Sequence, residues 1–329
     1  MNITILGAGA YALALTEMFK RGNNNVTIWT KIQSEYDMLI KERKNKRALP
    51  GYVIDDSVKF TMSMEEAVKG ANIVVIAIPV KFARETIREL KMFYKKNQHI
   101  CIASKGIEQD SLLFVSNIVR KIIRTKKVGV ISGGTFAVDM VLGVPVALTL
   151  ATKNIGTARV IKKALENDVL KLELSKDIFG VEMYGAIKNV IAIASGMIDG
   201  MNYPESTKCM FITKALNDVM NLIYDFGGNK KTILTYAGIG DLLLTCTSPK
   251  SRNYTLGKMF GEGVNRDIIQ EYINNTTIEG LYTLESIHNL VRSDNKKVDI
   301  IETIYNIIYK NDDVDKLREY LVKEQITRN

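Results

Sequence analysis

Short β-branched runs alternate with amphipathic segments over residues 1–178, and this alternation is the strongest constraint on the fold. Apolar runs predict strands at 2–6, 25–29, 73–78, 99–103 and 128–131, and weaker patterns predict three more at 57–61, 145–151 and 169–174. Helical periodicity lies between them at 10–22, 32–46, 64–69, 81–95 and 110–125. Strands that are apolar throughout suit a parallel sheet covered on both faces. We therefore expect an α/β fold with a Rossmann-type doubly wound sheet.

The strand pattern fades from about residue 179, and only helical periodicity follows. The helical stretches are 180–199, 206–226, 230–245, 254–261, 266–274, 280–292 and 298–309. The chain is long enough for two domains. We expect a Rossmann domain at residues 1–179 and an all-helical domain at residues 180–329.

The charge of the chain is unevenly distributed. It carries 45 Lys and Arg against 36 Asp and Glu, a formal net charge of +9. Residues 1–180 hold 28 basic and 17 acidic side chains, whereas the remainder holds 17 and 19. We expect the basic N-terminal half to meet anions such as phosphates.

Cysteine and histidine are both sparse. Cys101, Cys209 and Cys246 lie far apart, which predicts reduced thiols, and two histidines cannot form a His-rich metal site. No metal is expected. The N-terminal residues show no signal-peptide pattern and no apolar run predicts a membrane span, so we expect a soluble, cytoplasmic protein.

A glycine-rich fingerprint, Gly7-Ala-Gly9-Ala10-Tyr11-Ala12, separates the first predicted strand from the first predicted helix. Gly7 allows a tight turn, Gly9 leaves room for a pyrophosphate, and Ala12 permits close packing of helix on strand. The helix N-terminus adds unpaired N–H groups and positive potential. The motif predicts a dinucleotide site in the N-terminal domain.

The end of the second predicted strand bears on which dinucleotide is bound. NAD-specific proteins usually place an acid there for the ribose 2′-hydroxyl, but this strand ends in Trp29-Thr30-Lys31. Lys31 could contact a 2′-phosphate, or it could be a solvated lysine at a strand end. NADP(H) is slightly favoured over NAD(H).

Polar residues follow two later strands, where ligands bind in open α/β sheets: Ser104-Lys105-Gly106 and Gly133-Gly-Thr135-Phe-Ala137. In the helical domain, Lys188 and Asn189 interrupt an apolar helix that must be buried. Burial would lower the pKa of Lys188 toward the range of a general acid. The alternative is a lysine that reaches the surface.

A second polar cluster lies between residues 238 and 253. Asp241 precedes an apolar run and could form an ion pair with Lys188. Arg252 and Asn253 follow a loop rich in serine and offer a guanidinium group for a phosphate. Together these residues supply an acid/base lysine, an orienting carboxylate and cations for an anionic ligand.

Several of these motifs resemble those of the bacterial NAD(P)-dependent sn-glycerol-3-phosphate dehydrogenases. The resemblance runs from residue 1 to about 310 and rests on GAGAYALAL at 7–15, NKRALPG at 45–51, ASKGIE at 103–108, SGGTFA at 132–137, GAIKNVIAIASGMIDG at 185–200, GIGDLLLTCTSPKSRNYTLG at 238–257 and IEG at 278–280. It implies a Rossmann domain followed by a helical domain. It also implies reversible reduction of dihydroxyacetone phosphate to sn-glycerol 3-phosphate for phospholipid synthesis, in a homodimer.

The resemblance assigns roles position by position. Lys188 would be the proton donor and acceptor at the C2 oxygen, with Asp241 and Lys105 as further catalytic residues. The implied substrate-binding residues are Lys105, Gly133, Thr135, Lys188, Asn189, Asp241, Thr245, Ser251, Arg252 and Asn253. The implied cofactor-binding residues are Gly7, Gly9, Ala10, Tyr11, Ala12, Lys31, Lys105, Ala137, Arg252, Thr277 and Glu279.

The chain departs from the family pattern at several positions. Tyr11 stands where the family usually has Trp, Ala12 where it has Gly, and Thr135 where it has Ser. Gly134 replaces a Pro, Lys31 a frequent Arg, and residues 204–207 differ although Lys208 remains. None of these changes removes a catalytic group that the resemblance implies.

The sequence leaves two other functions open. A related two-domain dehydrogenase could act on a hydroxy acid or sugar acid, with another pocket in place of residues 251–253. A non-catalytic dinucleotide sensor or nucleic-acid-binding protein would use the positive N-terminal half. Its basic residues are dispersed, however, and a sensor has no need of both Lys188 and Asp241. We expect a small phosphorylated substrate and no nucleic-acid partner.

Overall fold

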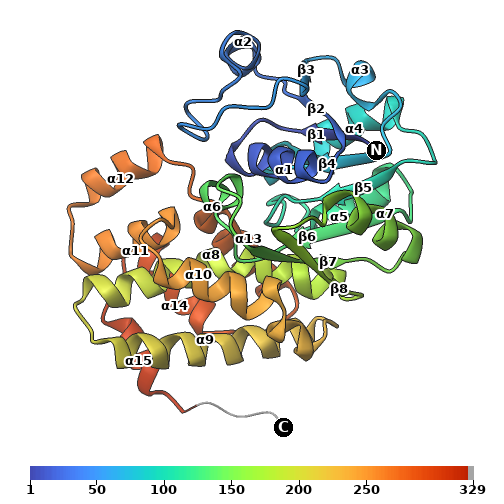
Figure 1. Ribbon diagram of the computed structural model, residues 1–329. Coiled ribbons are helices and arrows are strands. Elements are labelled where there is room, and N and C mark those ends of the chain that lie inside the picture. The colour runs from blue at the N-terminus through green and yellow to red at the C-terminus, as the bar shows by residue number, and fades with distance from the viewer. Residues whose placement is uncertain (325–329) are drawn as a thin grey trace. The chain divides into compact units, whose positions relative to one another are not determined.

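Eight strands form one sheet in the order β3-β2-β1-β4-β5-β6-β7-β8 (Figure 1). Their bounds are β1 Asn2–Leu6, β2 Asn25–Trp29, β3 Lys59–Thr61, β4 Ile73–Ile76, β5 His99–Ile102, β6 Val128–Ser132, β7 Val146–Ala151 and β8 Leu170–Ser175. Neighbouring strands run parallel except β6 and β7, which run antiparallel. The order turns at β1, as in a doubly wound sheet. The predicted α/β class is confirmed.

The computed structural model describes residues 1–324, and the chain divides into two units. The first comprises Met1–Lys105 and Phe114–Ile178; the second comprises Gly106–Leu113 and the chain from Phe179 onward. The short segment 106–113 belongs to the helical unit through α13 (Glu279–Ser293). Ser286 Oγ donates to the Ile107 carbonyl oxygen at 3.4 Å, and Gln109 Nε2 donates to Glu285 at 2.8 Å.

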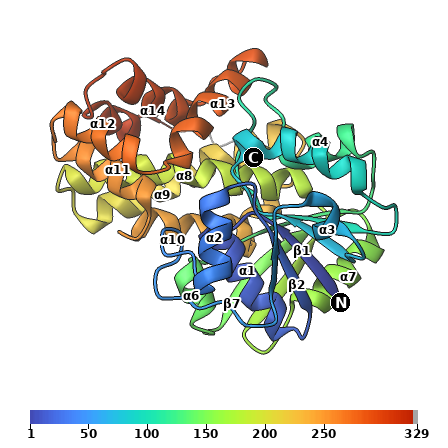
Figure 2. The ribbon, with the colours of Figure 1, turned by 90° about the horizontal axis from the view of Figure 1, so that it is seen from above.

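Helices cover both faces of the sheet in the first unit (Figures 1 and 2). They are α1 Ala10–Arg21, α2 Gln33–Glu42, α3 Met64–Val68, α4 Ala83–Phe93, α5 Val115–Ile122, α6 Ala137–Val141 and α7 Ile155–Leu165, with a 3₁₀ turn at Val80–Phe82. Side chains of strand β1 alternate between the two faces, so each face needs a cover. Ile3 and Ile5 join the core that includes Leu13 of α1, whereas Thr4 points to the opposite face and donates to the Ala67 carbonyl of α3.

The second unit is helical. Its helices are α8 Ile178–Gly200, α9 Glu205–Asp225, α10 Asp241–Thr247, α11 Arg252–Gly261, α12 Arg266–Asn275, α13 Glu279–Ser293, α14 Asp299–Tyr309 and α15 Lys316–Val322, with a 3₁₀ turn at Lys230–Leu234 and a π-helical turn at Tyr236–Gly240. Within the described residues, α8 alone is long and apolar enough to cross a membrane. Inside the protein, 89% of its most apolar stretch is buried.

Helices α8 and α11 cross at very short range. A Cβ added at Gly257 of α11 would lie 1.8 Å from the Ile193 carbonyl oxygen of α8, and one at Gly196 would lie 2.0 Å from the Tyr254 carbonyl oxygen. One helical turn further on, Gly200 and Gly261 are equally confined. Only glycine allows the two backbones to approach this closely. The crossing joins the helix that carries Lys188 to the helix that begins at Arg252.

The structure corrects several predicted helices. The helix predicted at 110–125 begins only at Val115, because Leu112 has a φ of 53° and interrupts helical geometry. The helix predicted at 230–245 is broken at Gly238, whose backbone is non-helical, and resumes at Asp241. Three helices had not been predicted: α6, α7 and α15.

Candidate cofactor and active sites

The glycine-rich turn between β1 and α1 has the form that a pyrophosphate site requires. Gly7 has a φ of +118°, and a Cβ there would lie 2.5 Å from the Ala77 carbonyl oxygen. Gly9 is the exposed N-cap of α1, and a Cβ there would meet nothing within 4 Å. The first turn of α1 contains no acidic residue. The open N-terminus of α1 therefore fits a dinucleotide phosphate. Ala12 is buried against the sheet, as predicted.

Asn45 forms a hydrogen bond to the backbone of this turn. The side chain is 1% exposed, and its amide Nδ2 donates to the Ala8 carbonyl oxygen at 2.9 Å. Its Oδ1 accepts from the Ala48 backbone N–H at 3.1 Å. The Ala8 carbonyl and the Gly9 N–H belong to one planar peptide group and point in opposite directions. Asn45 therefore directs the Gly9 N–H away from itself.

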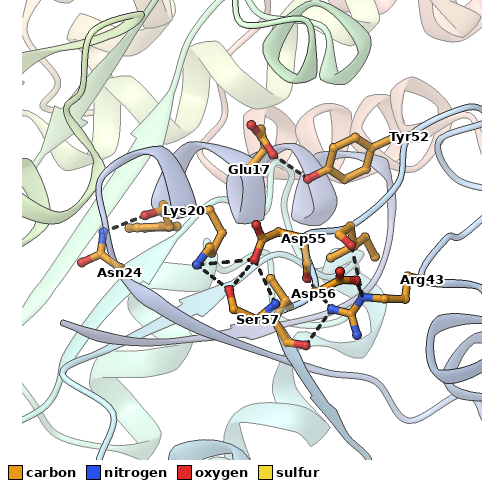
Figure 3. A network of polar contacts seen from close by, with 11 residues as sticks. Glu17, Lys20, Asn24, Arg43, Tyr52, Asp55, Asp56 and Ser57 are labelled. Atoms are coloured by element: carbon orange, nitrogen blue, oxygen red, sulfur yellow. Dashed lines mark hydrogen bonds and ion pairs between the residues drawn. The ribbon is translucent and has the colours of Figure 1, made fainter.

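A polar network holds the rest of the segment between α2 and β3 (Figure 3). Arg43 donates to the carbonyl oxygens of Ile54 at 3.1 Å and Val58 at 2.9 Å, and it pairs with Asp56 at 3.3 Å. Tyr52 donates to Glu17 of α1 at 2.9 Å. These bonds attach the segment to α1 and keep Asn45 beside the glycine-rich turn.

Four predicted site residues of the first unit lie together. Lys105 Nζ donates to the Gly133 carbonyl oxygen at 3.4 Å and lies 5.8 Å from the centre of the Tyr11 ring. The Tyr11 hydroxyl is 3.5 Å from Thr135 Oγ1. These residues come from the ends of β5 and β6 and the first turn of α1. The structure thus brings a cation, an aromatic ring and two polar groups to the end of the sheet where the glycine-rich turn begins.

Lys31 forms an ion pair with Glu85 of α4. Lys31 Nζ lies 2.6 Å from Glu85 Oε1, and both side chains are largely exposed. The pair raises the pKa of Lys31 and lowers the pKa of Glu85, by a hydrogen bond and by charge attraction. The sequence suggested a solvated or phosphate-binding lysine and gave no sign of this partner.

In the helical unit, Lys188 is held by two partners. Its side chain is 12% exposed, and Nζ donates to Asp241, whose side chain is 1% exposed. Nζ also donates to Thr245 Oγ1 at 3.0 Å. The structure therefore forms the ion pair that the residue types had suggested. Lys188 does not extend away to the surface.

The π-helical turn before α10 sets the direction of Asp241. A Cβ at Gly238 would lie 2.4 Å from the carbonyl oxygens of both Thr232 and Ile233, so no larger residue fits. Thr235 caps the turn by accepting from the Gly238 N–H at 3.2 Å. π-Helical turns often occur at functional sites. Here the turn ends at the carboxylate that pairs with Lys188.

The start of α13 is tied to the other predicted polar residues. Asn189 Nδ2 donates to Glu279 at 3.3 Å, and Asn253 Oδ1 accepts from the Gly280 N–H at 2.9 Å. Ser251 caps α11, because its hydroxyl accepts from the Tyr254 N–H at 3.3 Å. Arg252 and Thr277 are exposed. The start of α13 thus brings Asn189, Asn253 and Glu279 together. Arg252 and Thr277 make no part of these contacts.

Two of the three thiols, Cys101 and Cys246, are buried. Burial raises the pKa of Cys101 to about 12 and raises the pKa of Cys246 further, so neither is a thiolate at neutral pH. No group of three His, Cys, Asp or Glu side chains in the described part of the chain could hold a metal ion.

Two family models match most of the chain. The N-terminal model of NAD-dependent glycerol-3-phosphate dehydrogenase matches residues 2–158, and the C-terminal model matches residues 177–319. The chain belongs to the NAD-dependent glycerol-3-phosphate dehydrogenase family. The expected resemblance is confirmed, and so is the expectation of an NAD(P)-dependent dehydrogenase of this family.

Curated relatives of this family match over nearly the whole length. A glycerol-3-phosphate dehydrogenase (NAD(P)+) from Agathobacter rectalis is 31% identical over 328 residues, covering 100% of this chain and 96% of the relative. One from Nitrosomonas eutropha is 33% identical and covers 98% of each chain. The crystal structure of glycerol-3-phosphate dehydrogenase from Coxiella burnetii has a TM-score of 0.92 and 29% identity, covering 98% of this chain and 99% of that one.

Two features of this family member were missed by sequence reasoning. Asn45 lies inside the NKRALPG motif, which supported the resemblance but suggested no role for the asparagine. Glu85 stands 54 residues from Lys31, on a helix to which sequence reasoning assigned no functional role. A buried asparagine within a loop motif could have been singled out. The Glu85 pair needed the three-dimensional structure.

Proposed function

We propose that the chain catalyses reversible hydride transfer between NAD(P)H and dihydroxyacetone phosphate, giving sn-glycerol 3-phosphate, with Lys188 as the general acid and base. The observation that supports this most directly is the nearly buried Lys188 ammonium, which donates to both Asp241 and Thr245. A lysine in this setting is oriented by its partners and can exchange a proton with a bound ligand.

The proton balance follows from the geometry. The ammonium has three protons, of which one is donated to Asp241 and one to Thr245. A proton of this ammonium would be transferred to the C2 oxygen of the substrate. A reduced nicotinamide dinucleotide held at the glycine-rich turn would supply the hydride to C2. Lys188 would protonate the developing alkoxide and later regain a proton from solvent. In the reverse direction, neutral Lys188 accepts the hydroxyl proton.

The residues present fit both ligands. The open cradle at Gly9 and the α1 N-terminus suit the pyrophosphate of a dinucleotide. Arg252 is exposed at the start of α11 and can form a bidentate contact with the substrate phosphate. We assign Lys105, Gly133, Thr135, Asn189, Ser251 and Asn253 to substrate binding, and Ala10, Tyr11, Ala137, Thr277 and Glu279 to cofactor binding, on the family resemblance.

The remaining proposals follow from the resemblance and the charge of the chain. We propose that NADPH is used slightly better than NADH, because Lys31, and not an acid, lies just after the end of β2 at Trp29. The product would supply phospholipid synthesis in the cytoplasm. A homodimer is proposed on family resemblance, and light scattering of the purified protein measures it directly.

The experiment follows oxidation of NADPH and NADH by absorbance in the presence of dihydroxyacetone phosphate. Wild-type protein should oxidise at least one cofactor. Lys188→Ala should lower kcat at least about a hundredfold, the scale of general acid catalysis, with cofactor affinity unchanged. Wild-type kcat in this variant would rule out the mechanism. If wild-type protein binds cofactor but reduces only a hydroxy-acid precursor, the substrate assignment is wrong.

A further inference from the structure

A carboxylate lies at the position where the ribose 2′ group of a dinucleotide is normally recognised. Lys31 lies two residues after the end of β2 at Trp29, and Glu85 Oε1 of α4 lies 2.6 Å from its Nζ. In dinucleotide-binding sheets, an acid at the end of the second strand accepts a hydrogen bond from the ribose 2′-hydroxyl of NAD. A cation at the same place instead binds the 2′-phosphate of NADP. This chain places both charges at that point, one from the segment after β2 and one from α4.

Two other acids, Glu35 and Glu89, do not share this contact. Thr30 Oγ1 donates to Glu35 of α2 at 2.7 Å. Glu89, one turn along α4 from Glu85, acts on Lys31 only through longer-range charge attraction. Glu85 is therefore the acid in direct contact with Lys31.

We propose that Glu85 determines the NADP/NAD preference by holding the Lys31 ammonium. This inference rests on the proposed function, because it concerns the cofactor of that reaction. A 2′-phosphate must displace Glu85 from Lys31 and then lies close to a second negative charge. A 2′-hydroxyl requires no displacement. The intact pair thus lowers affinity for NADPH, relative to a free lysine, and leaves NADH little affected.

The expected effect is moderate because the pair is exposed. The side chains of Lys31 and Glu85 are 60% and 72% accessible to solvent, so water and salt screen their charges. Releasing Lys31 should strengthen NADPH binding by about twofold to fivefold, the size of one solvated charge contact. The gain should shrink at high ionic strength.

The test measures cofactor affinity without substrate, by titrating the fluorescence of NADPH and NADH on the full-length protein. Glu85→Gln should lower the Kd for NADPH about twofold to fivefold while the Kd for NADH stays nearly unchanged. Glu65→Gln, on an exposed position of α3, makes the same change in net charge and should alter neither Kd. Combining Glu85→Gln with Lys31→Ala should abolish the gain, because no lysine remains to be released.

Two results would overturn the proposal. One is an unchanged ratio of the two Kd values in Glu85→Gln; the other is a gain for NADPH of equal size in the Lys31→Ala background. Since the titration contains no substrate, it is independent of catalysis. A failed turnover assay with intact cofactor binding would contradict the proposed function and leave the role of Glu85 measurable.

Discussion

Thr245 Oγ1 lies 3.0 Å from Lys188 Nζ and donates its own proton to the Asp241 backbone carbonyl oxygen at 2.6 Å. Because the hydroxyl proton is committed to that carbonyl, Thr245 can only accept from the lysine. The threonine thus joins the backbone of α10 to the ammonium.

Thr245→Val should remove this acceptor with little change in side-chain volume. We expect kcat to fall about tenfold to a hundredfold, the cost of one hydrogen bond to a charged group. Thr245→Ser keeps the hydroxyl and should retain most of the activity. Steady-state kinetics with dihydroxyacetone phosphate measures both variants. Equal kcat values for the valine and serine variants would show that the hydroxyl does not orient Lys188.

Asn45→Ala should weaken both cofactors alike. The Ala8 carbonyl would lose its buried donor, at a cost of about 1–3 kcal/mol, and the Gly9 N–H would lose its fixed direction. Because the pyrophosphate is common to NADH and NADPH, both Kd values should rise about tenfold. Asn25→Ala removes an exposed amide contact and serves as the control. A change confined to one cofactor would contradict a role at the pyrophosphate.

Gly257→Ala should destabilise the helical unit. The new methyl group would lie 1.8 Å from the Ile193 carbonyl oxygen, so α8 and α11 must separate. We expect the free energy of unfolding to fall by about 3 kcal/mol or more. Gly240→Ala is the matched control, since its Cβ would have no neighbour closer than 3.9 Å. Thermal denaturation should show a lower Tm for the first variant alone.

Asp199 near the end of α8 should contribute a pH-dependent part of the stability. Burial alone would raise the pKa of Asp199, but hydrogen bonds from Lys208, Lys258 and Tyr254 outweigh it and lower the pKa to about 2. The folded state therefore holds the carboxylate more strongly than the unfolded chain does, whose aspartate pKa is about 4. The stabilisation is complete above about pH 4 and is lost as the pH falls toward 2.

Asp199→Asn should accordingly lower the free energy of unfolding by about 1–2 kcal/mol at neutral pH. The difference from wild type should shrink as the pH falls from about 4 toward 2, because protonation of the wild-type carboxylate removes its advantage over the amide. Urea denaturation at several pH values measures it. Asp168→Asn, on an exposed loop position, is the control. A difference that persists unchanged at pH 2 would indicate a packing effect of the amide.

The sheet could be predicted because a strand covered on both faces needs apolar side chains at nearly every position, as in β4 and β5. Helix ends were harder to predict, because they depend on single residues. Helix α7 begins at an Asn154 cap that accepts from the Thr157 N–H at 2.8 Å, a signal present in the sequence but not used. The break at Gly238 depends on the carbonyls of the preceding turn, which periodicity does not reveal.

The candidate site was predictable where chemistry is unusual for its surroundings. Lys188 stands out because a charge in an apolar helix requires a partner, and Asp241 was the acid available to it. Glu85 and Asn45 were missed for opposite reasons. Glu85 looks like any exposed helix acid until Lys31 is seen beside it, and Asn45 owes its role to burial against a loop that has no periodic pattern.

The membership of residues 106–113 in the helical unit has a consequence for dissecting the chain. The polypeptide passes from one unit to the other after Lys105, returns before Phe114 and leaves again after Ile178. No single cut therefore separates the two units. A fragment ending at residue 178 would retain eight residues deprived of the α13 side chains that hold them, Glu285 and Ser286. Lys105 is the last residue of the first unit before the chain enters the second. Its carbonyl carbon is bonded directly to Gly106, which belongs to the helical unit.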